Sequence, residues 1–174
     1  MKRTRSQIKI DANELEQWLA EYLEGYRVPA SGALSSQKGD VIWSEYLVDS
    51  KNTEKSTIPL KTLDLIKISR EGREAGKTGH LILTFLEKDE HWAVVPEIDC
   101  NFESLEETLT VEAKSVRISS TFLTAITRKA KKKNVIPSVY LEFSQMKLGT
   151  PRRWLIIPLS NYKELFKDGE NENI

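Results

Sequence analysis

Asp40, Asp49 and Lys51 are the residues whose types and spacing could carry chemistry. Asp40 follows a glycine-containing loop, whereas Asp49 and Lys51 lie two positions apart at the end of an apolar run. Side chains of an extended strand alternate between its faces, so Asp49 and Lys51 should project from the same side, where Asp40 can meet them. Two carboxylates suit Mg²⁺ or Mn²⁺, and a nearby ammonium can orient water and stabilise charge on a phosphate. The spacing therefore predicts phosphodiester hydrolysis.

Three short motifs in this part of the chain resemble the PD-(D/E)XK nuclease superfamily. They are Ser31-Gly32-Ala33, Gly39-Asp40-Val41 and Val48-Asp49-Ser50-Lys51, with a glutamate-bearing helix upstream. Within that superfamily, residues 13–97 most resemble the Holliday-junction resolvase-like enzymes of archaea and phages, although Asp49 stands where those enzymes usually carry Glu. The resemblance implies an α/β fold with a mixed central β-sheet flanked by helices, as in restriction endonucleases. It also implies a Mg²⁺ or Mn²⁺ cofactor, branched DNA as substrate, and a homodimer, because two symmetric nicks need two sites.

The resemblance also assigns roles to individual residues. Asp40 and Asp49 would bind the metal, Lys51 would activate water, and a glutamate of the first helix would assist. The loop residues that would lie near the DNA backbone are Ser31, Gly32 and Lys38.

The assisting glutamate has three candidates on the first predicted helix. Its position ahead of Leu19 and Tyr22 favours Glu16, with Glu14 and Glu21 as alternatives. A solvent-facing charge is the other interpretation of each of the three.

Composition limits the class of protein. The chain has 174 residues, of which 39% are hydrophobic and 30% are charged, as in a soluble globular protein. No apolar run approaches the roughly 20 residues that span a bilayer, and the basic start lacks the apolar segment of a secretory signal. We therefore expect a cytoplasmic protein without a membrane partner, consistent with a phage-encoded protein in a bacterial host.

Cys100, His80 and His91 are the remaining residue types that often carry chemistry. A single cysteine excludes an internal disulfide and a cysteine-based zinc site. The two histidines have no third metal ligand nearby in the sequence, so we expect structural roles for all three residues.

Charge is unevenly distributed in a chain whose formal net charge is zero. The basic run consists of Arg128, Lys129, Lys131, Lys132 and Lys133. Acidic residues dominate 97–112 and the tail 168–174, so a positive patch for DNA phosphates is predicted on a neutral protein. The alternative for the basic run is a solvated helix end, where the helix dipole favours cations.

The pattern of apolar and polar residues predicts one series of elements that occurs twice. In the first half the expected elements are a helix from residue 11 or 13 to 24, strands between 40 and 51, a helix at 60–75, and a hairpin of 80–85 with 91–96. In the second half they are a strand at 108–114, a helix at 120–132, a hairpin of 138–143 with 153–158, and a last helix at 161–166. This order predicts a nuclease-like core at 1–97 and a degenerate repeat at 98–174, although hairpins after helices are common enough to coincide.

The predicted repeat matches the triplet of Asp49 and Lys51 with Glu112 and Lys114. The second triplet has no Gly-Asp before it, and Asp99 is the only candidate for the missing ligand. We therefore expect Glu112 and Lys114 to be the remnant of a non-catalytic copy.

The leading function is a metal-dependent DNA endonuclease that acts on branched DNA in recombination or repair. The alternative is a catalytically inactive module that keeps the nuclease fold for binding DNA or a protein. Binding of a divalent metal would separate the two.

Overall fold

A computed structural model of the protein describes residues 5–28, 41–102 and 107–167, with side chains from residue 14 onward. The main sheet contains β1 (Tyr26–Arg27), β2 (Val41–Trp43), β3 (Tyr46–Thr53), β5 (Thr78–Phe85), β6 (Glu90–Pro96), β7 (Thr108–Val111), β9 (Val139–Phe143) and β10 (Arg153–Pro158). A separate ribbon pairs β4 (Thr57–Lys61) with β8 (Ser115–Ser119). The helices are α1 (Arg5–Leu23), α2 (Thr62–Glu74), α3 (Ser120–Lys133) and α4 (Leu159–Phe166), with short 3₁₀ turns η1 (Leu86–Lys88) and η2 (Glu97–Asp99).

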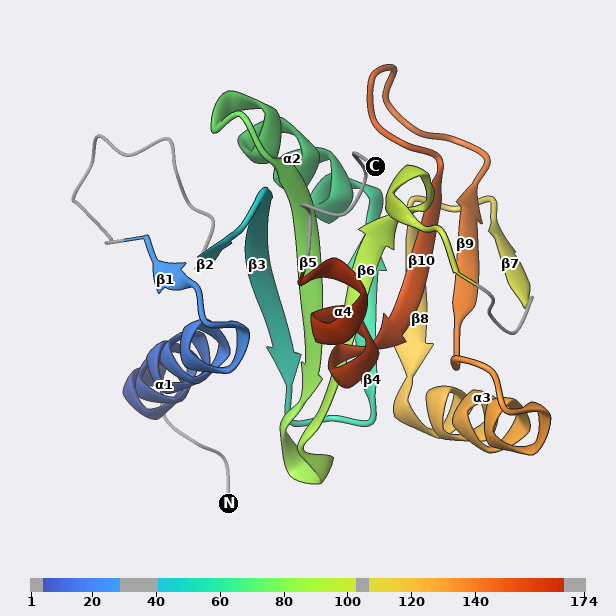
Figure 1. Cartoon of the computed structure of the whole chain (residues 1–174), viewed down its shortest axis with the longest axis horizontal. Coiled ribbons are helices and arrows are strands. Elements are labelled where there is room, and N and C mark those ends of the chain that lie inside the picture. The colour runs from blue at the N-terminus through green and yellow to red at the C-terminus, as the bar shows by residue number, and fades with distance from the viewer. Residues whose placement is uncertain (1–4, 29–40, 103–106, 168–174) are drawn as a thin grey trace, which may run out of the picture.

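The eight-stranded sheet is mixed and has helices on both faces, which confirms the prediction of an α/β fold with a mixed central sheet flanked by helices (Figure 1). One face packs against α1 and α4, which bury Leu19, Leu23 and Tyr162 beside Val48 of β3. The other face packs against α2, α3 and the β4–β8 ribbon. In the described part of the chain, no helix has the length and apolar character needed to cross a membrane.

The strand order reads β1-β2-β3-β5-β6-β10-β9-β7, and its last six strands are arranged about the β6–β10 pair. On one side β3 lies parallel to β5 and β5 antiparallel to β6; on the other β7 lies parallel to β9 and β9 antiparallel to β10. The central β6–β10 pair and the β4–β8 pair are both antiparallel. The strands of the two halves are therefore paired in the same order and directions, as a two-fold arrangement requires. A gene duplication stays a prediction.

The helices α2 and α3 bury the same pattern of residues. Leu65, Ile68 and Gly72 are buried on α2, and Leu123, Ile126 and Ala130 are buried at the same spacing on α3. This spacing places one stripe of each helix against the sheet.

The predicted elements differ from the structure at three places. Residues 5–10, which precede the predicted first helix, already belong to α1. Residues 57–61 form β4, although a helix is predicted to begin at residue 60. Residues 115–119, which lie between a predicted strand and a predicted helix, form β8. These two short strands pair with each other across the whole sequence, and such long-range pairing leaves no local signal.

The helix α2 lies unusually close to β5 at two glycines. A Cβ on Gly79 would collide with the backbone oxygen of Ile68, and a Cβ on Gly72 would lie 2.6 Å from the Gly79 nitrogen. Only glycine permits this approach, which sets the height of α2 over the sheet.

Candidate metal site

Asp49 and Lys51 lie on the same face of β3, as the alternation of strand side chains predicts. This is the face covered by α2, because Lys67 and Asp64 of that helix contact them. The predicted pair therefore lies between β3 and α2, where each residue contacts a side chain of the helix.

Both residues already have partners of opposite charge. Oδ1 of Asp49 accepts the backbone N–H of Ser50 at 2.8 Å, and its Oδ2 lies 3.5 Å from Nζ of Lys67. Nζ of Lys51 donates to Oδ2 of Asp64 at 2.8 Å. The Asp49 side chain is 17% exposed and that of Lys67 is 44% exposed, so the acid is mostly covered while its partner is open to solvent.

Glu71 is a further acid at this place, and no sequence motif singles it out. It lies one helical turn after Lys67, and it is buried, with 5% of its surface exposed. Among the described residues, no group donates a hydrogen bond to its Oε2. Burial raises the pKa of Glu71, and the negative charge of Asp49 raises it further, whereas Lys67 and Arg70 lower it.

Four of the predicted site residues lie outside the described residues: Asp40, Ser31, Gly32 and Lys38. Asp40 directly precedes Val41, which pairs with Val48 in the β2–β3 hairpin. Within the described ranges 14–28, 41–102 and 107–167, no three His, Cys, Asp or Glu side chains are grouped to hold a metal.

Glu16, the predicted assisting glutamate, is not brought to Asp49. Its Oε2 accepts a hydrogen bond from the Arg27 guanidinium at 2.7 Å. The core residues of α1 pack on the face of Val48, opposite to the face of Asp49. Of the alternatives, Glu14 is exposed and Glu21 is bonded to Gln17 on the same helix, so the structure brings no α1 glutamate of its described part to the site.

The second half contains a site that corresponds to the contact between β3 and α2. The two helices can be compared by matching their first residues, Thr62 of α2 and Ser120 of α3. In this alignment Glu71 corresponds to Lys129. The buried stripes of the two helices agree with this alignment.

The strands give the matching position for Asp49. Asp49 lies opposite Leu81 in the parallel β3–β5 pair, and Thr108 lies opposite Tyr140 in the parallel β7–β9 pair at the same sequence separation. When β5 and β9 are aligned with the same difference in residue number as α2 and α3, the residue that corresponds to Asp49 is Glu107.

This register corrects the predicted match of Asp49 and Lys51 with Glu112 and Lys114. Glu112 and Lys114 follow β7 and are exposed in a turn, because β7 ends at Val111 and the chain must bend into β8. At the corresponding place, Oε1 of Glu107 is bonded by Nζ of Lys129 at 2.9 Å. The second half therefore holds an ion pair where the first half holds two acids.

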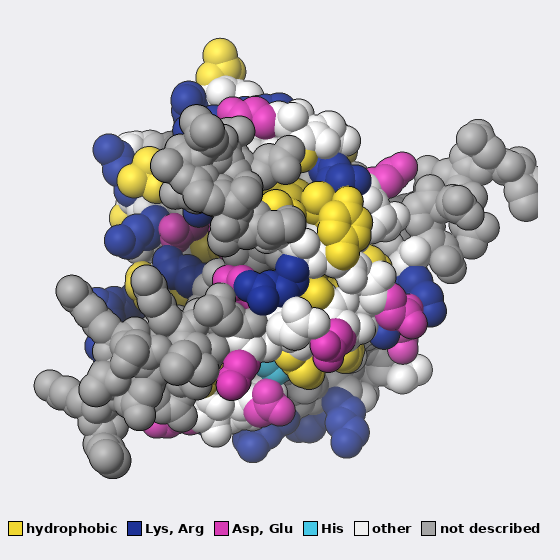
Figure 2. Space-filling view, turned by 90° about the vertical axis from the view of Figure 1, so that its left-hand side faces the viewer, with side chains coloured by type: hydrophobic (Ala, Val, Ile, Leu, Met, Phe, Trp, Pro, Cys, Tyr) yellow, Lys and Arg dark blue, Asp and Glu magenta, His cyan; other side chains and the backbone are white. Residues whose placement is uncertain are grey.

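The basic run occupies the end of α3, in the same layer as α2. Arg128, Lys129 and Lys131–Lys133 are exposed, and the helix ends at Asn134 in a left-handed conformation. The last three lysines lie in the final turn, where the helix dipole favours them, as the solvated alternative requires. Figure 2 shows the side of the molecule away from α3, at the β1–β3 edge, where basic and acidic side chains are both exposed.

A buried cluster of His80, Tyr162 and Asp99 lies on the opposite face, beneath α4. Nδ1 of His80 is 2.8 Å from the Tyr162 hydroxyl, and Nε2 is 2.9 Å from Oδ2 of Asp99. A carboxylate only accepts, so Nε2–H donates to Asp99 and Nδ1 accepts from Tyr162. Asp99 is thus engaged by His80, which removes it as the candidate ligand beside Glu112.

Stability should fall in mild acid because of His80. Burial lowers the pKa of His80 below its ordinary 6.5, although Asp99 opposes this effect. Below about pH 6.5 the unfolded chain therefore binds a proton that the folded chain does not, at a cost of up to about 1.4 kcal/mol per pH unit. Urea denaturation between pH 8 and 5 should show this loss, and His80→Gln, less stable at pH 8, should show a smaller slope. Equal slopes would contradict the assignment.

Cys100 has the structural role that its sequence context predicts. Burial raises the pKa of its thiol to about 12, helped by Asp99 and Glu97, and Sγ donates to the Pro96 carbonyl. A thiol in this state is protonated near neutral pH and is a poor nucleophile.

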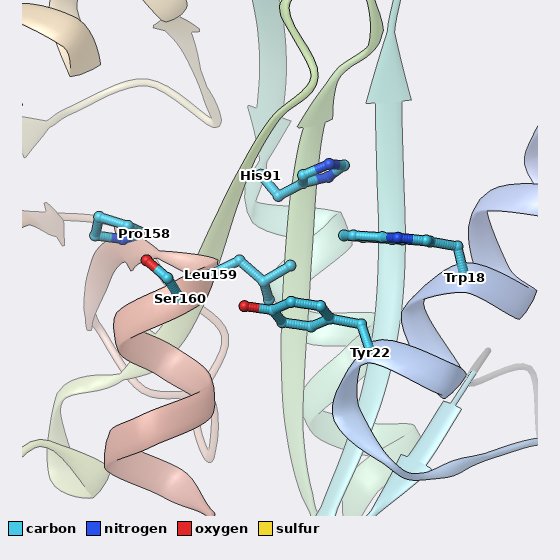
Figure 3. A pocket seen from close by; sticks show the side chains of 6 residues that line it. All are labelled: Trp18, Tyr22, His91, Pro158, Leu159 and Ser160. Carbon is cyan, nitrogen blue, oxygen red and sulfur yellow. The ribbon is translucent and has the colours of Figure 1, made fainter.

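A hollow of about 220 Å³ lies between α1 and α4 (Figure 3). Its lining consists of Trp18, Tyr22, His91, Pro158, Leu159 and Ser160. Trp18 stacks on the His91 ring at 4.4 Å, and His91 is also bonded to Thr84 and Asp89. This hollow is on the face of the sheet away from Asp49, and none of its lining residues is an acid that could take part in the metal site.

No protein-family model matches this chain, and a comparison with curated proteins gives no match.

Proposed function

We propose that this chain is a Mg²⁺- or Mn²⁺-dependent DNA endonuclease of the PD-(D/E)XK type. The observation that carries the proposal is the placement of Asp49 and Lys51 on the same face of β3, where both contact charged side chains of α2. A carboxylate and an ammonium at this spacing match the motif whose residues the sequence resembles.

A divalent cation fits the donor set at Asp49. Its Oδ2 already faces a positive charge, the Lys67 ammonium, at a separation of 3.5 Å. Because the Lys67 side chain is partly exposed, it can swing into solvent and leave this oxygen to a metal. We propose Asp40, which precedes the β2 strand, as the partner ligand.

The chain's own residues would orient the reaction. Bound Mg²⁺ or Mn²⁺ would polarise the phosphate and acidify a coordinated water. Lys51 would exchange its hydrogen bond to Asp64 for one to water or phosphate, and Ser31, Gly32 and Lys38 would contact the DNA backbone. Glu16 has no place in this account, since its carboxylate is held by Arg27 on the other face.

The proposed substrate is branched DNA, with a homodimer supplying two active sites for symmetric nicks. This part follows from the resemblance to resolvase-like enzymes, as does the cytoplasmic location.

The test is cleavage of end-labelled DNA by the purified protein. A four-way junction, a flap, a duplex and a single strand would each be incubated with Mg²⁺, Mn²⁺ or EDTA. We expect cleavage with either metal, strongest on the branched substrates and absent in EDTA. Intact substrates in the presence of a metal that the protein demonstrably binds would overturn the proposal.

The alternative is an inactive module with the same fold. It is favoured by one observation: in the described structure, Asp49 and Lys51 are both already paired with helix residues. A module of this kind would show no Mn²⁺-dependent rise in melting temperature, whereas a metal enzyme would show one.

The basic run provides a separate prediction about DNA binding. Replacing Lys131, Lys132 and Lys133 with Gln should weaken duplex binding and flatten its dependence on salt, by about 0.9 logarithmic units for each phosphate that is no longer neutralised. The control is Lys163→Gln on α4, in the opposite layer. An unchanged salt slope in the triple variant would leave these lysines as a solvated helix end.

A further inference from the structure

We propose that Glu71 is a further carboxylate ligand of the cation site at Asp49, so that β3 and α2 hold the metal together. This inference rests on the proposed metal site, and it adds a residue from an element that the sequence motif does not include.

The first argument is the state of the Glu71 carboxyl group. Only 5% of the residue is exposed, and within the described residues its Oε2 has no hydrogen-bond partner. A buried polar atom without a partner is costly, and native structures keep one mainly where a ligand, ion or water completes it. Lys67, one helical turn before Glu71, is already directed at Asp49.

The second argument is the direction of the Glu71 side chain. The corresponding positions in the second half, Glu107 and Lys129, touch at 2.9 Å. Because helix and strand have the same register in both halves, position 71 faces position 49 in the same way. The effect of the Asp49 charge on the pKa of Glu71 agrees with this placement.

The third argument is the difference in charge between the two places. In the second half Glu107 forms an ion pair with Lys129, so the pair is neutral and offers no net negative charge to a cation. In the first half the Lys67 ammonium lies 3.5 Å from Asp49, while Oε2 of Glu71 has no hydrogen-bond partner among the described residues. A divalent cation between the two acids would balance both.

The test is Mn²⁺ binding by calorimetry, with folding checked by circular dichroism. Glu71→Gln keeps the shape and removes the charge, so it should weaken Mn²⁺ binding at least about tenfold. The matched control is Glu107→Gln, the corresponding acid of the second half, which should bind Mn²⁺ as the wild type does. Lys129→Glu, an exposed substitution, should create a second pair of acids and raise the stoichiometry from one Mn²⁺ to two.

The outcomes distinguish the Glu71 assignment from the proposed function. If Asp49→Asn abolishes Mn²⁺ binding and Glu71→Gln leaves it unchanged, the Glu71 assignment is wrong while the proposed function stands. If the wild type binds no Mn²⁺, both fall. If Glu71→Gln does not fold, the stoichiometry of Lys129→Glu decides, and a value that stays at one overturns the inference.

Discussion

Asp49→Asn is expected to abolish metal-dependent DNA cleavage while leaving the protein folded. The substitution preserves shape and the hydrogen bond from the Ser50 N–H, but it removes the charge that binds the cation. A metal contributes several kcal/mol to stabilising a phosphoryl transition state, so a loss of about 4 kcal/mol, or roughly a thousandfold in kcat, is expected. The measurement is the single-turnover rate on the best DNA substrate at saturating Mg²⁺.

The same variant should be at least as stable as the wild type. The charge of Asp49 is one cause of the raised pKa of Glu71, so its removal relieves a repulsion in a buried place. A gain in stability together with a loss of activity is typical of a functional site. Glu112→Gln is the control, because that exposed residue lies in the turn after β7. Full activity in Asp49→Asn, or its loss in Glu112→Gln, would contradict the site.

Gly79→Ala should destabilise the fold strongly. The new Cβ would collide with the backbone oxygen of Ile68, and backbone cannot move aside as a flexible side chain can. Overpacking of this kind costs about 1 to 3 kcal/mol, and a clash with backbone lies at the upper end. The free energy of unfolding in urea is the measurement.

The control for Gly79→Ala is Gly76→Asn in the turn between α2 and β5. Gly76 has φ of +67°, a conformation that Asn tolerates, and nothing lies within 4 Å of a Cβ there. Gly76→Asn should therefore cost well under 1 kcal/mol. If the two variants were equally stable, α2 would not lie as close to β5 as the structure has it.

Local patterns predicted the elements whose burial is periodic. The hairpins β5–β6 and β9–β10 consist of apolar runs, and α2 and α3 carry apolar stripes. The two hairpins and the two helices could therefore be predicted from the sequence. The β4–β8 ribbon was missed because each strand is short and its partner lies in the other half. The match of Glu112 with Asp49 failed for a related reason: register depends on pairing, and similar triplets do not reveal it.

The candidate site could be predicted only in part from the sequence. Asp49 and Lys51 share a face because strands alternate, and that follows from spacing alone. Glu71 was missed because a glutamate on a charged helix is usually exposed. One signal was present: Glu71 falls three residues after Ile68 and next to Gly72, on the stripe that faces the sheet.

The most direct test of the account is a crystal structure of the protein soaked in Mn²⁺. We predict one anomalous peak between β3 and α2, with carboxylate oxygens of Asp49 and Glu71 about 2.0 to 2.2 Å from the metal. The place of Glu107 and Lys129 should be empty. A peak at Glu107 instead, or no peak beside Asp49 in a crystal whose lattice contacts leave this part of β3 and α2 open to solvent, would contradict the account.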